Sequence, residues 1–175
     1  PNLKSLIDIA VRSARRIQHL TNSLLDINRL EAGQPIGDRQ LSDLAMLAAD
    51  AVEIVLPIML SKHQELENLI PSGLPPVFVD TDMIRRALTN LLENAIRYSP
   101  KGGKIQLGAQ HEGELIRVWV QDNGPGIRPE DQKRIFDKFI RLQTHDMHKG
   151  LGLGLAYCRL ILNAHRGHIW VESEV

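Results

Sequence analysis

The sequence predicts an α+β fold in which a mixed sheet carries helices layered on one face, preceded by one long helix. The first observation is a three- and four-residue spacing of apolar side chains over residues 3–32, which is typical of an amphipathic helix and ends at Gly33 and Pro35. The second is a pair of β-patterned runs, residues 104–110 and 115–121, which predict a hairpin. The third is that helical patterns lie on both sides of this hairpin.

The long N-terminal helix carries a single apolar stripe, which it cannot bury by itself. We therefore expect a partner helix, either from elsewhere in a longer parent protein or from a second subunit. Glycine and proline then mark a linker. The predicted organisation is an N-terminal helix, a linker and a second domain, at residues 1–33, 34–40 and 41–175.

The second domain begins with a helix that Ser42 is expected to cap and that runs to about Lys62, with a kink near Pro57. Short strands are predicted at residues 65–69 and 77–79. A second helix, capped by Asp80 or Thr81, follows from about residue 82 to Tyr98 and ends before Pro100. Beyond the hairpin we expect a short helix, an apolar helix and a final strand, near residues 129–136, 152–164 and 168–172.

Composition narrows the possible partners. Hydrophobic residues make up 43% of the chain and charged residues 24%, which excludes a disordered segment. Lys plus Arg equals Asp plus Glu at 21 each, so no overall field attracts nucleic acid, and we expect no nucleic-acid partner. Any anion must be bound by local geometry.

The cysteine content and the hydropathy predict a cytoplasmic segment. Cys158 is the single cysteine, so an internal disulfide is excluded, and its helical apolar surroundings predict burial. The apolar run at residues 54–60 is too short for a bilayer and contains Pro57, and no signal peptide precedes it. A longer parent could still be membrane-anchored.

An acidic glycine turn, residues 122–127, follows the second strand of the hairpin. Gly124 and Gly126 permit positive φ and close approach, while Pro125 restricts the backbone between them. Folding alone does not require the carboxylate of Asp122 at the base of this turn. The turn is therefore a candidate contact for a ligand.

The helix at residues 82–98 has an apolar face and a polar face. Asn90, Asn94 and Arg97 share the polar face, with Glu93 and Tyr98 on its flanks. A solvated surface explains most such stripes. Asparagine nevertheless lowers helix propensity, and an amide oxygen suits a Mg²⁺ ion that is already bound to phosphate.

A second glycine run, residues 150–155, opens the apolar helix and is a candidate phosphate site, because a helix N-terminus presents free N–H groups. It matches neither the Walker loop nor the dinucleotide fingerprint, and taken by itself such a run is better explained as a turn for tight packing. Between the two glycine clusters, residues 135–139 carry two phenylalanines, which predicts a loop or lid with aromatic anchors.

The order of these segments resembles the four boxes of the histidine kinase catalytic domain. That domain belongs to the Bergerat ATPase group with gyrase B, a heat-shock chaperone and mismatch-repair proteins. Residues 90–100 resemble the N box, 122–127 the first glycine box, 135–139 the F box and 150–155 the second glycine box. Residues 22–33 resemble the end of the second helix of the dimerisation and phosphotransfer hairpin.

This resemblance implies a Bergerat-type α/β sandwich that binds ATP and Mg²⁺. By the same resemblance, Asp122 would accept a hydrogen bond from the adenine amine, which suits a buried carboxylate, and Asn94 would ligate Mg²⁺ with support from Asn90. Arg97 would lie near the phosphates, and Tyr98 near the base or ribose. The resemblance also assigns to the pocket Gly124, Gly126, Ile127, Phe136, Gly150, Leu151, Gly152, Leu153 and Gly154.

The resemblance also implies the reaction. Hydrolytic relatives carry a glutamate where Asn90 stands, so transfer of the γ-phosphoryl group to a histidine is expected, for relay to an aspartate of a response regulator. Glu93 is a weaker candidate for the general base. The acceptor histidine is expected before Pro1, with His19 a poor substitute, and a further strand is expected after Val175. A homodimer through the dimerisation helices is expected in the parent.

Three other interpretations remain open. The first is a Bergerat-type ATPase, and the second is a nucleotide-free scaffold that acts through residues 3–32. The third is a zinc site, since His145 and His148, and again His165 and His168, are spaced three residues apart. The absence of a cysteine partner argues against zinc.

Overall fold

The computed structural model describes residues 3–33, 37–142 and 151–175 of the chain. It divides into two compact units, residues 1–35 and residues 36–175, each of which is described by itself.

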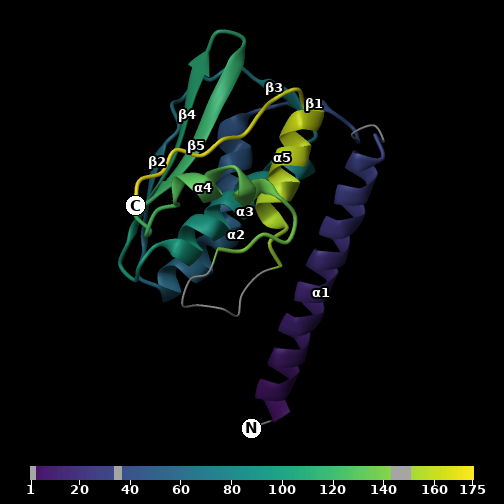
Figure 1. Ribbon diagram of the computed structural model, residues 1–175, viewed down its shortest axis with the longest axis vertical. Helices are drawn as coiled ribbons and strands as arrows, with labels where there is room; N and C mark the ends of the chain where they lie inside the picture. The colour runs from purple at the N-terminus through teal and green to yellow at the C-terminus, as the bar shows by residue number, and fades with distance from the viewer. Residues whose placement is uncertain (1–2, 34–36, 143–150) are drawn as a thin grey trace. The chain divides into compact units, whose positions relative to one another are not determined.

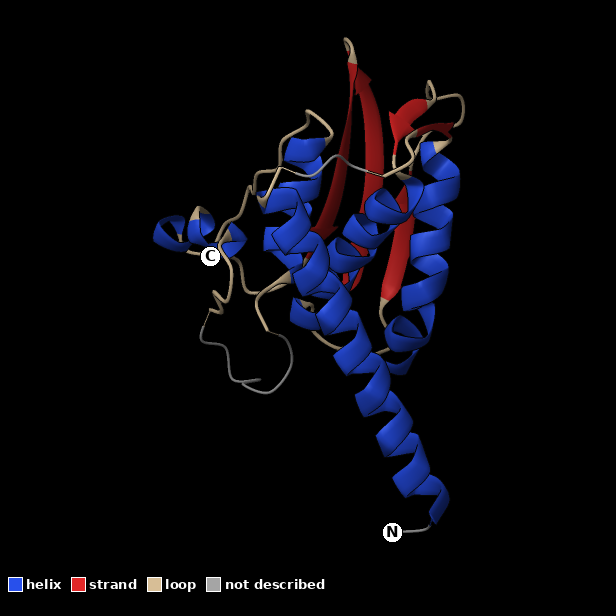
Figure 2. Ribbon diagram, turned by 90° about the vertical axis from the view of Figure 1, so that its right-hand side faces the viewer, coloured by secondary structure: helices blue, strands red, loops and turns tan. Residues whose placement is uncertain are grey.

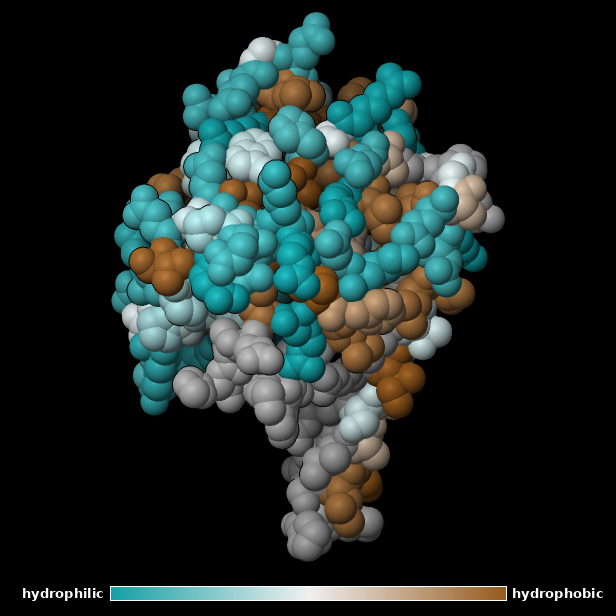
Figure 3. Space-filling model, viewed as in Figure 1, coloured by the Kyte–Doolittle hydropathy of each residue, from teal (hydrophilic) through white to brown (hydrophobic). Residues whose placement is uncertain are grey.

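The first unit is a single helix, α1 (Leu3–Glu31), as the apolar spacing predicts. Gly33 follows it with a φ of +69°, a left-handed conformation that often ends helices. Several large apolar side chains along α1 are exposed, and Figure 3 shows apolar surface along the helix: Leu6, Ile7, Val11, Ile17, Leu24 and Leu25. The helix thus has apolar surface that its own fold does not bury.

The second unit has helices on one face of a mixed sheet. Its first four elements are β1 (Gln40–Ser42), α2 (Leu44–Ser61), β2 (Glu65–Leu69) and β3 (Val77–Val79). They are followed by α3 (Thr81–Tyr98), β4 (Lys104–Glu112), β5 (Leu115–Asp122), α4 (Pro129–Gln132), the 3₁₀ turn η1 (Arg134–Phe136) and α5 (Gly154–Ala164). Figures 1 and 2 show α2, α3 and α5 on the same side of the strands. The predicted fold class is confirmed.

The main sheet has the order β2-β4-β5, in which β2 pairs with β4 in parallel and β4 with β5 antiparallel. Alternate residues of β4 enter the core: Ile105, Leu107 and Ala109 are buried, whereas Gln106 between them is partly exposed. The predicted strands at 65–69 and 77–79 and the predicted hairpin are therefore confirmed.

A separate two-stranded sheet, β1 with β3, is a feature that the sequence analysis missed. Leu41 lies opposite Phe78 in this antiparallel pair, and both side chains are exposed. Residue 40, which we expected in the linker, is the first residue of β1. A strand of three residues is too short to give a recognisable period, so its pairing comes from tertiary contacts.

Helix α2 packs its buried side on α3. Asp43, and not Ser42 as predicted, caps the helix, because its carboxylate accepts a hydrogen bond of 2.8 Å from the N–H of Ala45. Pro57 lies inside the helix. The helix is long and apolar enough to cross a membrane, but this is weak evidence, because a core helix meets the same criterion. Its buried residues are Leu44, Leu47, Ala48, Ala51, Val55 and Met59.

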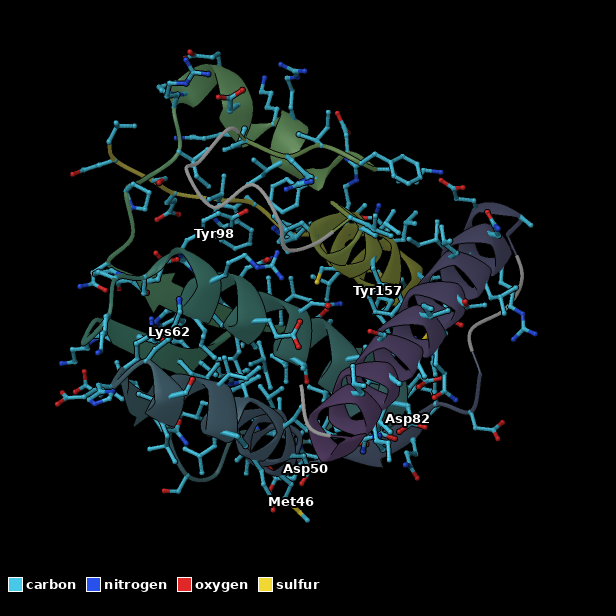
Figure 4. All side chains as sticks on the ribbon, turned by 90° about the horizontal axis from the view of Figure 1, so that it is seen from below. Met46, Asp50, Lys62, Asp82, Tyr98 and Tyr157 are labelled. Carbon is cyan, nitrogen blue, oxygen red and sulfur yellow. The ribbon has the colours of Figure 1, made fainter. Side chains whose placement is uncertain are left out.

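Helix α3 is fixed at both ends. Asp80 caps its start by accepting a hydrogen bond from the N–H of Met83 at 3.0 Å, as the sequence predicted. At its end the Lys62 ammonium donates to the carbonyl of Ile96 at 2.5 Å, and the buried Gln64 amide donates to that carbonyl at 3.1 Å. The Gln64 amide also reaches the carbonyls of Ser99 and Pro100, each at 3.1 Å. In Figure 4, Lys62 and Tyr98 lie at this end of the helix.

Helices α3 and α5 run antiparallel. The N–H of Asp80 donates to Nε2 of His165 at 3.0 Å, and Sγ of Cys158 lies 3.5 Å from the carbonyl oxygen of Ala87. Cys158 is fully buried, as predicted, and burial raises the pKa of its thiol to about 12. The chain's single thiol is therefore a core group.

The predicted strand at 168–172 is wrong. These residues form no strand in the structure, although their apolar and β-branched side chains have strand propensity. Side chains connect this segment to β5 instead: the Arg117 guanidinium lies 5.1 Å from the ring centroid of Trp170 and 3.3 Å from the carboxylate of Glu172. Strand propensity thus did not lead to backbone pairing.

Two other boundaries differ from prediction. The short helix near 129–136 is divided into α4 and η1, and α5 begins at Gly154 because Gly152 has a φ of +69°. A left-handed residue cannot be part of a right-handed helix. The glycine run thus forms a turn before the helix starts.

Replacing Gln64 with alanine is expected to destabilise the second unit by about 2–3 kcal/mol, because three carbonyls lose a buried donor. Urea denaturation followed by circular dichroism measures this change. Gln40→Ala is the matched control, since this exposed amide makes one contact, to Thr81 Oγ1 at 3.4 Å. Equal stability of the two variants would contradict this account of α3.

Replacing Gly108 with alanine is expected to destabilise the sheet by about 1–3 kcal/mol. A Cβ at this position would lie 2.2 Å from Cζ2 of Trp119, so the indole ring must move. Gly167→Ala is the control, because its Cβ would make ordinary contacts at 3.5 Å or more. The same denaturation measurement applies, and an unchanged midpoint in Gly108→Ala would disprove the crowding.

Candidate functional site

The polar face of α3 is partly covered by protein. Asn90 is 7% exposed, while Glu93, Asn94 and Arg97 are half-buried and Tyr98 is exposed. A solvated surface therefore does not explain Asn90, because α5 packs over this part of the helix. Within the described residues, the side chains of Glu93, Asn94 and Arg97 form no hydrogen bond or ion pair with one another.

Asn90 meets the glycine start of α5. A Cβ built on Gly154 would lie 3.4 Å from the amide oxygen of Asn90. This is an ordinary van der Waals distance, so the start of α5 and the amide of Asn90 lie directly against each other. The fold thus places the asparagine helix against the second glycine run, two segments that the sequence analysis assigned to one site.

The segment with aromatic anchors also joins the second glycine run. The N–H of Phe139 donates to the carbonyl of Gly152 at 2.9 Å, and a Cβ on Gly152 would lie 2.6 Å from the carbonyl oxygen of Ile140. Phe136 is buried, so it anchors this segment in the core. Phe139 itself is exposed with a φ of +65°.

The remaining residues of the second glycine run differ in exposure. Leu151 is exposed and Leu153 is buried at the base of α5. Leu153 therefore fixes the helix start, and Leu151 faces outward. The predicted contact at Gly150 lies outside the described residues.

The acidic turn after β5 lies against the end of α3. A carboxylate oxygen of Asp122 accepts the N–H of Gly124 at 2.8 Å, and a Cβ on Gly124 would lie 3.1 Å from the carbonyl oxygen of Tyr98. Asp122 is exposed, so the expected burial of its carboxylate is wrong: it ends a strand and supports its own turn. Asn123, which the sequence analysis did not single out, accepts the N–H of Lys104 at 3.2 Å.

The second half of this turn contacts the last residues of the chain. Gly126 has a φ of +76°, and the backbone of Glu174 passes so close that no Cβ would fit. The N–H of Ile127 donates to Ser173 Oγ at 2.9 Å. The structure therefore brings Asp122 and Gly124 to the end of α3, whereas Gly126 and Ile127 face residues 173–174.

The structure adds three residues that sequence reasoning missed. Lys62 and Gln64 fix the end of α3, and the guanidinium of Arg39 donates to the carbonyl of Ala164 at 2.8 Å. Each acts on a backbone carbonyl more than thirty positions away. Local sequence patterns carry no signal for such contacts.

The described residues hold no group of three or more His, Cys, Asp or Glu side chains that could bind a metal. His165 uses both ring nitrogens, one toward the N–H of Asp80 and the other toward the carbonyl of Ile161 at 2.8 Å. His168 stacks on Trp170 at 5.0 Å. The zinc interpretation is therefore wrong for this pair, while His145 and His148 lie outside the described residues.

The arrangement suits a ligand that carries both phosphate and a cation. The glycine turn at the start of α5 offers backbone N–H groups at the positive end of a helix. Asn90 offers a neutral amide oxygen beside it, and Asn94 offers another one turn later on α3; such oxygens are acceptable ligands for a hard cation. Near the C-terminal end of α3, the exposed carboxylate of Asp122 offers a hydrogen-bond acceptor. It would suit a ligand that carries a hydrogen-bond donor on another part of its structure.

Comparison with known proteins agrees with this arrangement. Residues 79–175 match the model of the family described as histidine kinase-, DNA gyrase B- and HSP90-like ATPases. The adaptive-response sensory kinase SasA of Synechococcus sp. (strain JA-3-3Ab) is 37% identical over 97% of this chain. The match covers 45% of SasA, so the chain spans slightly less than half of that relative.

Solved structures show the same fold. Full-length ShkA in complex with AMPPNP has a TM-score of 0.77 and 26% identity, over 97% of this chain and 36% of ShkA. ThkA in complex with the response regulator TrrA has a TM-score of 0.72 over 98% of this chain and 47% of ThkA, and at 23% identity it shows the fold alone. The chain therefore belongs to the family of histidine kinase-, DNA gyrase B- and HSP90-like ATPases, in the sensor histidine kinase branch.

Proposed function

We propose that this chain binds Mg-ATP and transfers its γ-phosphoryl group to a histidine of the dimerisation and phosphotransfer domain. The observation that carries the proposal is the contact between Asn90 on α3 and the glycine start of α5, at Gly154. It joins an amide that can support a cation to N–H groups that can bind phosphate. The ShkA structure, which contains AMPPNP, supports a nucleotide as the ligand.

The residues present fit Mg²⁺ bound to phosphate. The half-buried Asn94 lies one turn after Asn90, and its amide makes no hydrogen bond within the part of the chain that the structure describes. Asn94 would hold the ion and Asn90 would support it. When bound, Mg²⁺ neutralises charge on the phosphates. Arg97 on the same face would add a positive charge near them.

Asp122 is our proposed contact for the adenine amine. One of its oxygens supports the turn at Gly124, and the carboxylate is exposed at the end of β5. Tyr98, at the adjoining end of α3, would contact the base or the ribose. The adenine would then be held by the acidic turn after β5, and the phosphates by the glycine turn before α5.

Asn90 favours phosphoryl transfer over hydrolysis. An amide cannot take a proton from water, so this position can support the ion but cannot act as a general base for hydrolysis. Glu93, half-buried on the same helix, is the remaining candidate base. The chain's residues thus position the nucleotide for in-line attack by an incoming imidazole.

We further propose that α1 is the second helix of a dimerisation and phosphotransfer domain, within residues 1–33, and that two copies associate through it. The exposed apolar side chains along α1 support this proposal. A response regulator would receive the phosphoryl group, as the complex of ThkA with TrrA suggests by analogy. The site of action would be the cytoplasm.

Asn94→Ala is expected to remove the Mg²⁺-dependent part of nucleotide binding, because the ion loses its protein ligand. Titration calorimetry with a non-hydrolysable ATP analogue, with and without Mg²⁺, measures the loss, which we expect to exceed about tenfold in Kd. Asn163→Ala, an exposed asparagine on α5, is the control. Equal Mg²⁺ dependence in both variants would contradict the assignment.

A chain extended to include the preceding dimerisation helix is expected to form acid-labile phosphohistidine from radiolabelled ATP. Asp122→Ala in the extended chain should lose this label through weaker adenine binding. Release of inorganic phosphate without any labelled histidine would instead support a hydrolytic ATPase. A chain that binds no nucleotide would support a scaffold.

A further inference from the structure

The last residues of the linker contact the ends of both helices that carry the proposed site. We call this cluster the linker junction and define it as Gly37, Arg39, Asp80, Ala164 and His165. A Cβ on Gly37 would lie 2.8 Å from the Asp80 carboxylate, so the linker backbone passes close to the cap of α3. Arg39 donates to the carbonyl of Ala164 at 2.8 Å, at the end of α5.

The junction also joins the two helices to each other, because the N–H of Asp80 donates to His165 at 3.0 Å. From there α3 and α5 run antiparallel in a fixed register: Ala87 contacts Cys158, and Asn90 meets Gly154. Figures 1 and 2 show the two helices side by side. The glycine turn before α5 is therefore one helix length, about 16 Å, from the junction.

A helix of eleven residues transmits displacement along its axis, because its backbone hydrogen bonds make it stiff. At its far end, the carbonyl of Ala164 belongs to the last turn and has no donor within the helix. Arg39 supplies a charged donor, which also complements the negative end of the helix dipole. The guanidinium thus holds the end of α5 together with the hydrogen bond between Asp80 and His165.

We propose that Arg39 is a positioning residue for the nucleotide phosphates. By holding the end of α5, Arg39 positions the glycine turn at residues 152–154 against Asn90. A change in the linker would therefore change the affinity for the nucleotide phosphates. This inference rests on the proposed function, because it assigns the phosphate end to that turn. It adds a route by which the linker reaches the site without touching the nucleotide.

The expected signature of Arg39→Ala is selective. Binding of Mg-AMPPNP should weaken by about fivefold or more, while binding of adenosine should change by less than twofold. Adenosine lacks the phosphates and would meet the Asp122 side of the site, which the junction does not contact. A general loss of folded protein would weaken both ligands equally, so the ratio of the two dissociation constants separates positioning from stability.

The test is an NMR titration of the ¹⁵N-labelled chain with each ligand. Before ligand is added, Arg39→Ala should shift the amide signals of Gly152 and Gly154, and Arg39→Lys should restore part of the affinity by donating one hydrogen bond. Arg166→Ala is the matched control, because it removes the same charge beyond the same helix end, and its side chain is exposed.

In Arg39→Ala, the ratio of the dissociation constants for Mg-AMPPNP and adenosine could stay as in the wild type, or the amide signals of Gly152 and Gly154 could stay unshifted. Either result would overturn this inference while leaving the proposed function intact. The same loss in Arg166→Ala would also overturn it, because general charge would then explain the effect. A wild-type chain that binds neither ligand would overturn the proposed function, and this inference with it.

Discussion

The hydrogen bonds at the C-terminal end of α3 fix the position of that helix end and of the acidic turn that contacts it. Lys62 and Gln64 follow the end of α2, and their side chains donate hydrogen bonds to carbonyls at the end of α3. Without these donors the last turn of α3 would have buried acceptors and no partners. Because that turn touches Gly124, the position of the acidic turn after β5 also follows from this contact.

One helix thereby serves both the core and the candidate site. Leu88 and Leu92 of α3 are buried in the apolar core, whereas Asn94 and Arg97 on another side are only half-buried. The hydrophobic side cannot rotate without exposing apolar surface, which fixes the direction of the polar side chains. The asparagines are thus oriented by core packing and by α5, and need no hydrogen-bond network of their own.

Sequence patterns predicted the features that depend on interactions between residues close together in the sequence. The hairpin, the Asp80 cap and the glycine turns arise from residues that lie close together in the sequence. Contacts between distant segments were not predictable: Arg39 with Ala164 is the clearest case. The carboxylate of Asp122 was expected to be buried because it was expected to bind the adenine amine. It is exposed, because Asp122 is the last residue of β5. The strand at 168–172 failed because propensity does not supply a backbone partner.

The burial of Cys158 makes the surface of this chain free of thiols. A cysteine introduced at an exposed position would be the reactive one, since burial keeps the native thiol protonated. Spectroscopic probes could therefore be attached in pairs, for instance on α1 and on α2, with no background from the native residue. The orientation of the N-terminal helix relative to the catalytic unit is thus open to distance measurements in solution.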